Sequence, residues 1–268
     1  MSGAGVAVDG PILEVRGLSK RFGAVAAAQD IDVGIAERSV VGLIGANGAG
    51  KTTFINMVTG YLKPDAGRIT YASRDITGLG PRATARLGIA RSFQIPQLYG
   101  SLTVLENVMV GLGIVVRNAG LGGFFARGRP HVPGYDAPEG EVAERLLAAF
   151  SLLDCRNEPA RALAGGLRKL LDIALAMIGR PRILLLDEPT SGVSTEEKFA
   201  VMAMILGAVR AEGATVLFVE HDMEVVERSA ERVLAFYDGR IIADGEPRAV
   251  LDDPGVQRRV VGAVPEPR

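Results

Sequence analysis

Two stretches of the chain alternate short apolar runs with longer segments of helical periodicity. The apolar runs are bounded by Gly, Pro and polar residues, as is typical of buried strands. They predict strands over residues 12–16, 31–35, 40–44, 67–72, 182–186, 214–219 and 233–237. Helical periodicity between them predicts helices over residues 51–60, 195–211 and 222–230. Buried strands that alternate with helices indicate a doubly wound α/β core.

The pattern changes between residues 95 and 180, where strand-like runs disappear. Helical periodicity there covers residues 102–112, 141–154 and 166–179, and a Gly- and Pro-rich stretch lies among them. We therefore expect a mostly helical subdomain inserted into the core. The predicted division is an α/β core with an N-terminal β subdomain over 12–94 and 180–240, a helical subdomain over 95–179 and a short C-terminal extension over 241–268.

Composition narrows the class of protein. The 268 residues are 48% hydrophobic, enough for a large core, and 30 basic residues nearly balance 31 acidic ones. This balance argues against a nucleic-acid partner, since such proteins carry a basic surface. The single cysteine, Cys155, fits a reducing compartment. Apolar runs fall short of the roughly 20 residues that cross a bilayer, and the N-terminus lacks a signal-peptide pattern, so any membrane role is expected to be peripheral.

A complete phosphate-binding loop follows the apolar run at 40–44 and precedes a predicted helix. It matches the pattern G-x-x-x-x-G-K-[ST], in which backbone amides and a helix N-terminus surround phosphate oxygens. The nucleotide-binding residues predicted here are Gly45, Ala46, Asn47, Gly48, Ala49, Gly50, Lys51, Thr52 and Thr53. We expect Lys51 to reach the β- and γ-phosphates of a nucleotide and the Thr52 hydroxyl to bind Mg²⁺.

Two further strand ends carry candidate catalytic residues. Asp187 and Glu188 end the apolar run that begins at 182, and His221 follows the run that begins at 214. Asp187 is expected to hold Mg²⁺ through its water shell, Glu188 to polarise the attacking water, and His221 to contact the γ-phosphate. Solvated acids in a turn and an ordinary surface histidine are the alternatives for these positions.

The order of these motifs resembles that of the ATP-binding-cassette (ABC) transporter ATPases. The resemblance rests on the phosphate loop, Gln94, the segment Leu163-Ala164-Gly165-Gly166-Leu167, the Asp-Glu pair and His221. It implies an ABC-type P-loop NTPase fold and hydrolysis of ATP with Mg²⁺ by a head-to-tail dimer. Each nucleotide would lie between the phosphate loop of one subunit and the signature segment of the other, here Ala164, Gly165 and Gly166.

The same resemblance assigns roles to two more residues. Phe22 occupies the place of an aromatic residue that stacks on adenine, although a core phenylalanine is the alternative. Gln94 occupies the place of a glutamine that contacts Mg²⁺ or the attacking water, and it is therefore both a catalytic and a metal-site candidate. The apolar segment 93–99 around it is a candidate docking surface for a membrane subunit, or ordinary packing of the helical subdomain.

More locally, the chain is similar to the ATPases of branched-chain amino-acid (Liv-type) uptake systems. The similarity lies in Lys20-Arg21-Phe22-Gly23, the long insert before the signature, and the tail that includes Gly245-Glu246-Pro247. It implies uptake of branched-chain or other amino acids, or of related small polar solutes. The implied partners are a second ATPase subunit, two membrane permease subunits and, indirectly, a periplasmic binding protein. For the second ATPase subunit a different chain is favoured, and a second copy of this chain is the alternative.

The implied location is the cytoplasmic face of the inner or plasma membrane. An ATPase subunit of a lipopolysaccharide or lipid exporter, and a soluble ABC ATPase without a transport role, are the alternatives. The transported substrate and the direction of transport cannot be read from the residues.

Three positions depart from the usual ABC pattern. Ala164 replaces a signature serine, Leu167 replaces a glutamine, and Ser194 occupies the place of a loop aspartate. In the family all three face the nucleotide of the partner subunit, which suggests an asymmetric heterodimer with one slow site. The alternative is that backbone amides near Gly165 do most of the binding, so that alanine is tolerated.

Overall fold

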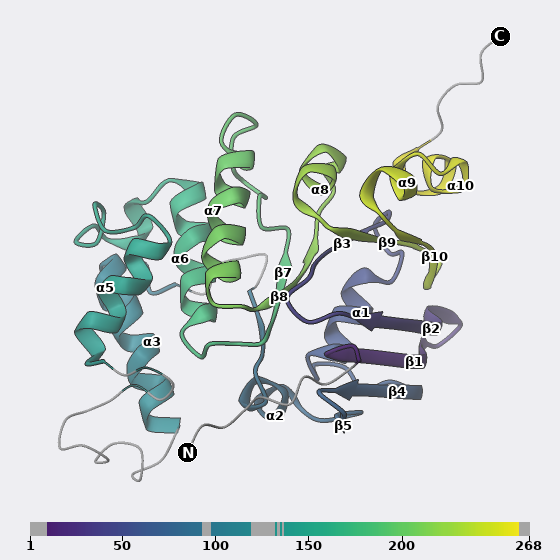
Figure 1. The fold of residues 1–268 in the computed structure, drawn as a ribbon, viewed down its shortest axis with the longest axis horizontal. Coiled ribbons are helices and arrows are strands. Elements are labelled where there is room, and N and C mark those ends of the chain that lie inside the picture. The colour runs from purple at the N-terminus through teal and green to yellow at the C-terminus, as the bar shows by residue number, and fades with distance from the viewer. Residues whose placement is uncertain (1–9, 93–97, 119–131, 133–134, 136, 263–268) are drawn as a thin grey trace. The chain divides into compact units, whose positions relative to one another are not determined.

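The computed structural model describes residues 10–92, 98–118, 132, 135 and 137–262. It divides into two compact units, which are labelled by element in Figure 1. The first unit comprises Met1–Arg86 and Ala230–Arg268, and the second comprises Leu87–Ser229. This division does not test the three-part division predicted from the sequence, which stays a prediction.

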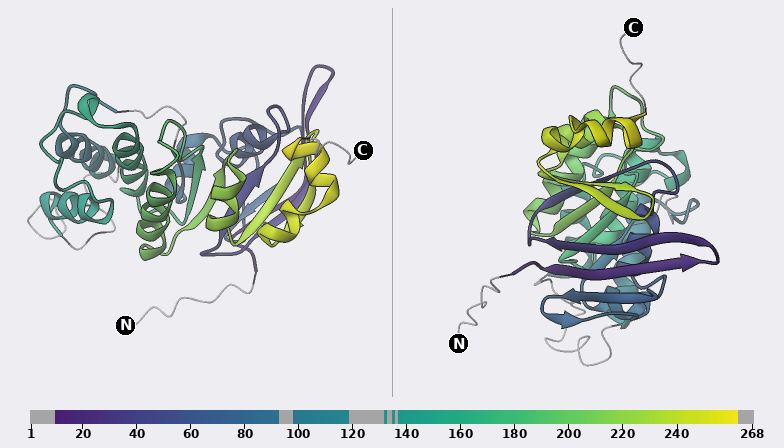
Figure 2. Two further views of the ribbon diagram at one scale, coloured as in Figure 1. Left: turned by 90° about the horizontal axis from the view of Figure 1, so that it is seen from above. Right: turned by 90° about the vertical axis from the view of Figure 1, so that its right-hand side faces the viewer.

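The first unit contains one antiparallel sheet and a second group of three strands. Its elements are β1 (Leu13–Phe22), β2 (Val25–Ile35), β3 (Val40–Ile44), α1 (Lys51–Val58), β4 (Ala66–Tyr71), β5 (Arg74–Asp75), α2 (Pro81–Arg86), β9 (Arg232–Tyr237), β10 (Arg240–Gly245), α9 (Pro247–Leu251), α10 (Pro254–Val256) and the π-helical turn η2 (Gln257–Val261). The antiparallel sheet has the order β2-β1-β4-β5, and Figure 2 shows its purple and blue strands side by side. Strand β3 pairs with β9 in parallel, and β9 pairs with β10 in antiparallel fashion.

The second unit joins a short parallel sheet to helices. Its elements are β6 (Ile89–Arg91), α3 (Val104–Asn118), α5 (Glu139–Ala149), the 3₁₀ turn η1 (Ala160–Ala162), α6 (Gly165–Met177), β7 (Ile183–Asp187), α7 (Lys198–Ala211), β8 (Thr215–Val219) and α8 (Met223–Ser229). Strands β6, β7 and β8 run parallel in that order. The first four residues of β7 and all of β8 are buried, as expected for a parallel sheet covered on both faces.

The parallel sheet positions the candidate catalytic residues. Because β6, β7 and β8 run in one direction, their carboxyl ends lie at the same sheet edge. Arg91 ends β6, Asp187 ends β7, and Glu220 and His221 follow β8. Side chains that are far apart in sequence therefore lie together at this edge.

The α/β fold class predicted from the sequence is confirmed, while several element boundaries differ. The strand predicted at 12–16 continues to Phe22, because it pairs with β2 along its whole length. The helix predicted at 141–154 ends at Ala149, since Ser151 adopts a left-handed backbone with φ of 55°. The three-residue strand β6 was not predicted, because its pairing with β7 is long-range. Within the part of the chain that the structure describes, every helix is too short or too polar to cross a bilayer.

Candidate functional site

The phosphate loop lies in the first unit, between β3 and α1, and its glycines are required by close backbone contacts. A Cβ atom at Gly45 would lie 2.5 Å from the carbonyl oxygen of Phe236, and one at Gly50 would lie 2.6 Å from that of Ala27. Both glycines also have positive φ, of 151° and 106°. Side chains at these positions would clash with backbone that cannot move aside, so the sequence fixes the path of the loop.

The N-terminus of α1 presents backbone amides without a capping side chain. Gly50 is the N-cap and supplies no side-chain hydrogen bond, and the first turn contains no acidic residue. An uncapped helix N-terminus is a favourable site for phosphate oxygens. Ala46, Asn47, Gly48 and Thr52 are exposed, whereas Ala49 is buried and Thr53 is half-buried.

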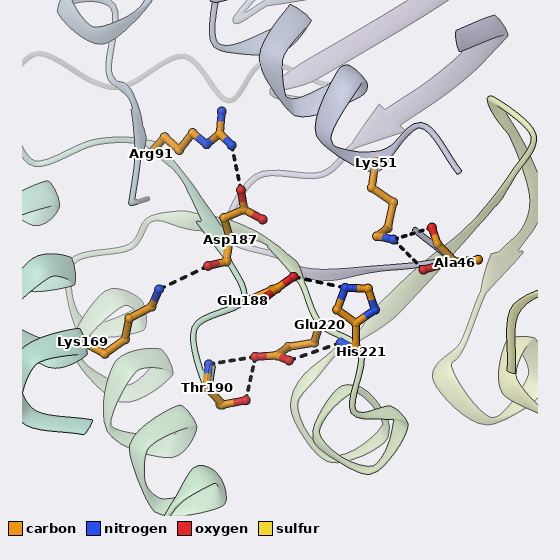
Figure 3. A network of polar contacts seen from close by, with 10 residues as sticks. Ala46, Lys51, Arg91, Lys169, Asp187, Glu188, Thr190, Glu220 and His221 are labelled. Carbon is orange, nitrogen blue, oxygen red and sulfur yellow. Dashed lines mark hydrogen bonds and ion pairs between the residues drawn. The ribbon is translucent and has the colours of Figure 1, made fainter. Parts of the chain in front are cut away.

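Lys51 is buried and directed into the loop. Its ammonium donates to the carbonyl oxygens of Gly45, at 2.5 Å, and of Ala46, at 3.1 Å (Figure 3). The charge therefore already lies among the loop residues. An ammonium has only three N–H donors, so a phosphate oxygen that binds Lys51 would compete with these carbonyl oxygens.

Phe22 ends β1 and is 52% exposed, so it does not belong to the core. The Lys20 ammonium lies 5.8 Å from the centroid of its ring, within the range of a cation–π contact. Exposure of a large aromatic ring excludes the core alternative for Phe22 and leaves a ring face accessible for stacking.

The acid pair at the end of β7 lies in the second unit. Asp187 and Arg91 form an ion pair of 2.7 Å in which both side chains are largely buried. Glu188 follows with a left-handed backbone, φ of 48°, and its amide donates to the carbonyl oxygen of Val219 at 3.0 Å. A left-handed non-glycine residue costs roughly 1–2 kcal/mol, and such strain clusters at functional sites. It directs Glu188 away from the regular continuation of the strand.

Glu188 and His221 are brought together, as Figure 3 shows. Glu188 Oε1 and His221 Nε2 lie 3.1 Å apart, with His221 45% exposed and Glu188 22% exposed. An ionised carboxylate can only accept a hydrogen bond, so this contact is a hydrogen bond in the tautomer that carries its proton on Nε2. Two residues that are 33 positions apart in the sequence thus form one acid–histidine pair, consistent with adjacent roles in a reaction.

A buried carboxylate braces this pair, and sequence reasoning missed it. Glu220 is 4% exposed, and its Oε1 accepts from the Thr190 amide at 2.8 Å and the Thr190 hydroxyl at 2.7 Å. Its Oε2 accepts from the His221 amide at 3.3 Å. The carboxylate therefore links the turn after Glu188 to the backbone of His221 (Figure 3). The available signal was a charged residue that directly follows the apolar residues 216–219 of the fully buried strand β8.

Lys169 is a second buried charge that the sequence did not reveal as part of the site. It is 2% exposed, and its ammonium donates to the carbonyl oxygen of Asp187 at 3.2 Å. Burial lowers the pKa of Lys169, while the carboxylates of Asp172, Asp187, Glu220 and Glu188 oppose that shift. The positive charge of Lys169 offsets part of the repulsion among these carboxylates at the end of the strand.

Asp222 fixes the helix that follows His221. Its Oδ1 accepts from the amides of Glu224 and Val225, at 3.0 and 3.2 Å, and its Oδ2 forms an ion pair with Lys198 at the start of α7. Partial burial alone would raise the pKa of Asp222, but the ion pair and the amides together lower it. The position of His221 is thereby tied to both α7 and α8.

The signature segment begins α6. Ala164 is the exposed N-cap and supplies no side-chain hydrogen bond. A Cβ atom at Gly165 would lie 2.7 Å from the carbonyl oxygen of Gly192, so glycine allows the helix to approach the loop between β7 and α7 closely. Ser194, in that loop, donates from its hydroxyl to Glu197 at 2.8 Å and thus supports the start of α7. The helix offers uncapped amides, as the first unit does at α1.

Gln94 and the segment 93–97 lie outside the described residues, so their predicted roles stay predictions. At the edge of that segment, Tyr99 is 57% exposed, and its amide donates to Asn107 Oδ1 at 2.9 Å. Tyr99 therefore presents an aromatic side chain on an anchored backbone.

Thr52 in the first unit and Asp187 in the second each carry an oxygen donor of the kind that Mg²⁺ prefers. The Thr52 hydroxyl is exposed, and the Asp187 carboxylate ends a strand. Mg²⁺ typically uses one or two carboxylates together with substrate phosphates and waters, without a dedicated protein cage. In agreement, the described ranges contain no cluster of three or more His, Cys, Asp or Glu side chains that could hold a metal by itself.

Comparison with known proteins agrees with these features. The sequence profile of the family described as ABC transporter matches residues 28–191. The chain is 36% identical to the high-affinity branched-chain amino acid transport ATP-binding protein BraF of Pseudomonas aeruginosa, over 94% of this chain and 98% of that protein. It is 33% identical, over the same shares, to the corresponding protein LivG of Escherichia coli K12.

Solved structures give the same result. The chain matches an ATP-binding cassette of an ABC transporter in its ADP conformation, with a TM-score of 0.77 and 32% identity, over 91% of this chain and 96% of that one. It also matches a nucleotide-free ATP-binding cassette, with a TM-score of 0.76 and 30% identity, over 92% and 97% of the two chains. The fold is thus that of cassettes solved in both nucleotide-bound and nucleotide-free states.

Proposed function

Because this chain belongs to the ABC transporter family and is one of its ATP-binding ATPases, we propose that it energises uptake of branched-chain amino acids. The proposal is supported by relatives such as BraF and LivG, whose names state branched-chain amino acid transport. Other amino acids and related small polar solutes belong to the same proposal, since the substrate is selected by other subunits. A lipid exporter and a soluble ABC ATPase have less support, because the names of BraF and LivG state amino acid transport.

The phosphate loop is proposed to bind the triphosphate of ATP. The amides of residues 45–53 surround the phosphate oxygens, and Lys51 exchanges the carbonyl oxygens of Gly45 and Ala46 for the β- and γ-phosphates. Phe22 stacks on the adenine with its exposed ring. The uncapped start of α1 is the observation that carries this assignment.

Thr52, Asp187 and Gln94 are the residues proposed to hold Mg²⁺. When bound, Mg²⁺ neutralises charge that develops on the phosphate oxygens. The Asp187 carboxylate would accept hydrogen bonds from waters around the ion while it stays paired with Arg91. Arg91 and Lys169 keep Asp187 in place when no ion is bound.

Glu188 is proposed to accept a proton from the attacking water, and His221 to position the γ-phosphate. In the described structure His221 Nε2 lies 3.1 Å from Glu188 Oε1, where an Nε2–H group would donate to the carboxylate. Turning that N–H towards a γ-phosphate oxygen frees the Glu188 carboxylate to accept the water proton. Glu220 and Thr190 position both backbones throughout this exchange.

The working assembly is proposed to be a head-to-tail dimer, with a different ATPase subunit as the favoured partner and a second copy of this chain as the alternative. Ala164, Gly165 and Gly166 then face the nucleotide bound by the partner. Two membrane permease subunits complete the transporter, a periplasmic binding protein delivers substrate to it, and this chain lies at the cytoplasmic face of the membrane. No nucleic acid takes part.

Uptake by proteoliposomes that contain the purified transporter tests this proposal. We expect ATP supplied on the side of this subunit to drive accumulation of labelled leucine on that same side. The same vesicles with Lys51→Ala in this subunit should accumulate far less, because its ammonium no longer reaches the phosphates. ATP-dependent transport of lipid, or ATP hydrolysis without any solute movement, would contradict the uptake function.

A further inference from the structure

A cavity of about 180 Å³ lies among α5, α6 and α7 of the second unit, the helices labelled in Figure 1. Its floor is apolar and consists of Val142, Leu146, Phe150 and Met177, each at most 8% exposed. Pockets for drug-sized ligands begin at roughly 300 Å³, so this cavity suits a small metabolite with an apolar part. None of these side chains has a role in the nucleotide site.

The rim of the cavity is charged. Arg145, Arg180 and Glu212 line it, together with Tyr135. Arg180 Nε donates to Glu212 Oε2 at 3.0 Å, and the Arg180 guanidinium lies 5.3 Å from the centroid of the Tyr135 ring. Burial raises the pKa of the Tyr135 hydroxyl and the Glu212 carboxylate raises it further, while the Arg180 guanidinium opposes the shift without reversing it, so the ring stays neutral. Arg180 and Glu212 are therefore held in place before any ligand arrives.

The second guanidinium is held more weakly. Arg145 pairs with Glu141, four residues earlier on α5, and its side chain is 63% exposed. Exposed ion pairs between residues i and i+4 of a helix contribute little to stability. The Arg145 guanidinium can therefore turn to a ligand carboxylate at little cost.

The charges around the cavity select the class of ligand. Arg145 and Arg180 carry two positive charges, and their partners Glu141 and Glu212 carry two negative ones, so the sum is zero. A simple anion would face Glu212, a simple cation would face both guanidiniums, and a wholly apolar molecule would desolvate charges without replacing their hydrogen bonds. A zwitterion meets both signs without adding net charge.

We propose that this cavity binds a free α-amino acid with an aliphatic side chain. The α-carboxylate binds the Arg145 guanidinium, the α-ammonium binds the Glu212 carboxylate, and the side chain lies on the apolar floor over Leu146 and Met177. The cavity volume limits the ligand to a single small amino acid.

The place of the cavity in the chain connects it to the ATPase residues. Met177 and Arg180 lie on the continuous run of chain that begins with the signature glycine Gly165 and ends with Glu188. A bound ligand that restrains Met177 and Arg180 thus restrains the segment that links the signature to the acid pair. A role in sensing accumulated transport substrate rests on the proposed function, whereas amino-acid binding itself does not.

Isothermal titration calorimetry of the full chain with L-leucine tests the proposal. We compare leucine with 4-methylpentanoate, which lacks the ammonium, and with 3-methylbutylamine, which lacks the carboxylate. Both analogues should bind at least about tenfold more weakly than leucine, because each makes only one of the two ion pairs that leucine makes at the rim.

Two variants locate the binding. Arg145→Gln and Glu212→Gln, both at exposed positions, should each weaken leucine binding at least about tenfold, because each removes one charged partner of the zwitterion. The matched variants Arg117→Gln and Glu227→Gln, exposed elsewhere in the second unit, should leave it unchanged within about twofold. Retained Mg·ATP binding by all four confirms that they are folded.

Two results would overturn the proposal: absence of heat from leucine at concentrations up to about 10 mM, or binding that neither rim variant weakens. If leucine binds as expected but the reconstituted transporter moves no amino acid, only the proposed transport function fails. The two proposals therefore fail separately.

Discussion

The phosphate loop and the catalytic strand ends bind and position by different means. The loop uses main-chain amides, and its glycines are required because Phe236 and Ala27 place carbonyl oxygens against Gly45 and Gly50. The strand ends use side chains, among which Glu220 accepts three hydrogen bonds and Lys169 is buried against the Asp187 carbonyl. One region depends on the absence of side chains and the other on a network of them.

This difference determines how each region should respond to substitution. A backbone-built site fails when an added atom displaces the chain, and it fails as a whole. A side-chain network loses one contact at a time, and each hydrogen bond to a charged group contributes roughly 1.5–3 kcal/mol. We therefore expect large effects on nucleotide binding from the loop and graded effects on turnover from the strand ends.

The largest effect is expected from Gly50→Ala. The new Cβ would lie 2.6 Å from the Ala27 carbonyl oxygen, at a residue with φ of 106°. The resulting displacement of the loop should lower Mg·ATP affinity about 100-fold, measured by equilibrium binding. Gly80→Ala is the matched control, since a Cβ there meets no atom within 4 Å. Equal affinity of both variants would show that the loop is not held by these contacts.

Glu220→Gln should affect turnover more than nucleotide binding. The substitution keeps one acceptor oxygen but places an NH₂ group against N–H donors of Thr190 or His221. We expect kcat to fall about tenfold with KM changed less than about threefold, as measured by phosphate release in the assembled transporter. Glu224→Gln, an exposed glutamate on α8, is the control. A fall in ATP affinity with unchanged kcat would contradict the bracing role.

Thr190→Val should produce a smaller change of the same kind. It removes the hydroxyl that donates to Glu220 at 2.7 Å but leaves the backbone amide that donates at 2.8 Å. Loss of one such bond predicts a decrease in kcat of about two- to fivefold in the same assay. A decrease as large as that of Glu220→Gln would mean that the hydroxyl, rather than the pair of bonds, holds the turn.

Ala164→Ser tests whether the backbone alone suffices at the signature. The serine restores a side-chain cap and a possible donor to the partner's nucleotide at the start of α6. If the site completed by Ala164 is slow, turnover of the transporter should rise by up to about twofold, because both nucleotide sites would then be active instead of one. An unchanged rate would favour the alternative in which the amides near Gly165 do most of the binding.

The sequence predicted the backbone-built region more fully than the side-chain network. The loop is contiguous, so its nine residues could be read in order from 45 to 53. Glu188 and His221 were each identified because they follow buried strands, but their contact with each other was not predicted and comes from the structure. Arg91 and Lys169 were missed, because their contacts with Asp187 join positions 96 and 18 residues apart. Such contacts depend on strand register and helix orientation, which local pattern does not determine.

Phe22 shows the converse case. The sequence left stacking and core packing open, because an aromatic residue at the end of a strand fits both. Its exposure in the structure removes the core alternative. Gln94 lies outside the described residues, and its role therefore still rests on resemblance alone.

The most direct test of the central claim is single-turnover hydrolysis by a transporter that carries Glu188→Gln in this subunit. We expect Mg·ATP affinity within about threefold of the unaltered protein and hydrolysis at this chain's phosphate loop slowed at least about 100-fold, because the proton acceptor for water is lost. Glu196→Gln, exposed in the following turn, is the control. Unchanged hydrolysis at that loop, or loss of ATP binding from a folded protein, would contradict the role of Glu188 as the proton acceptor.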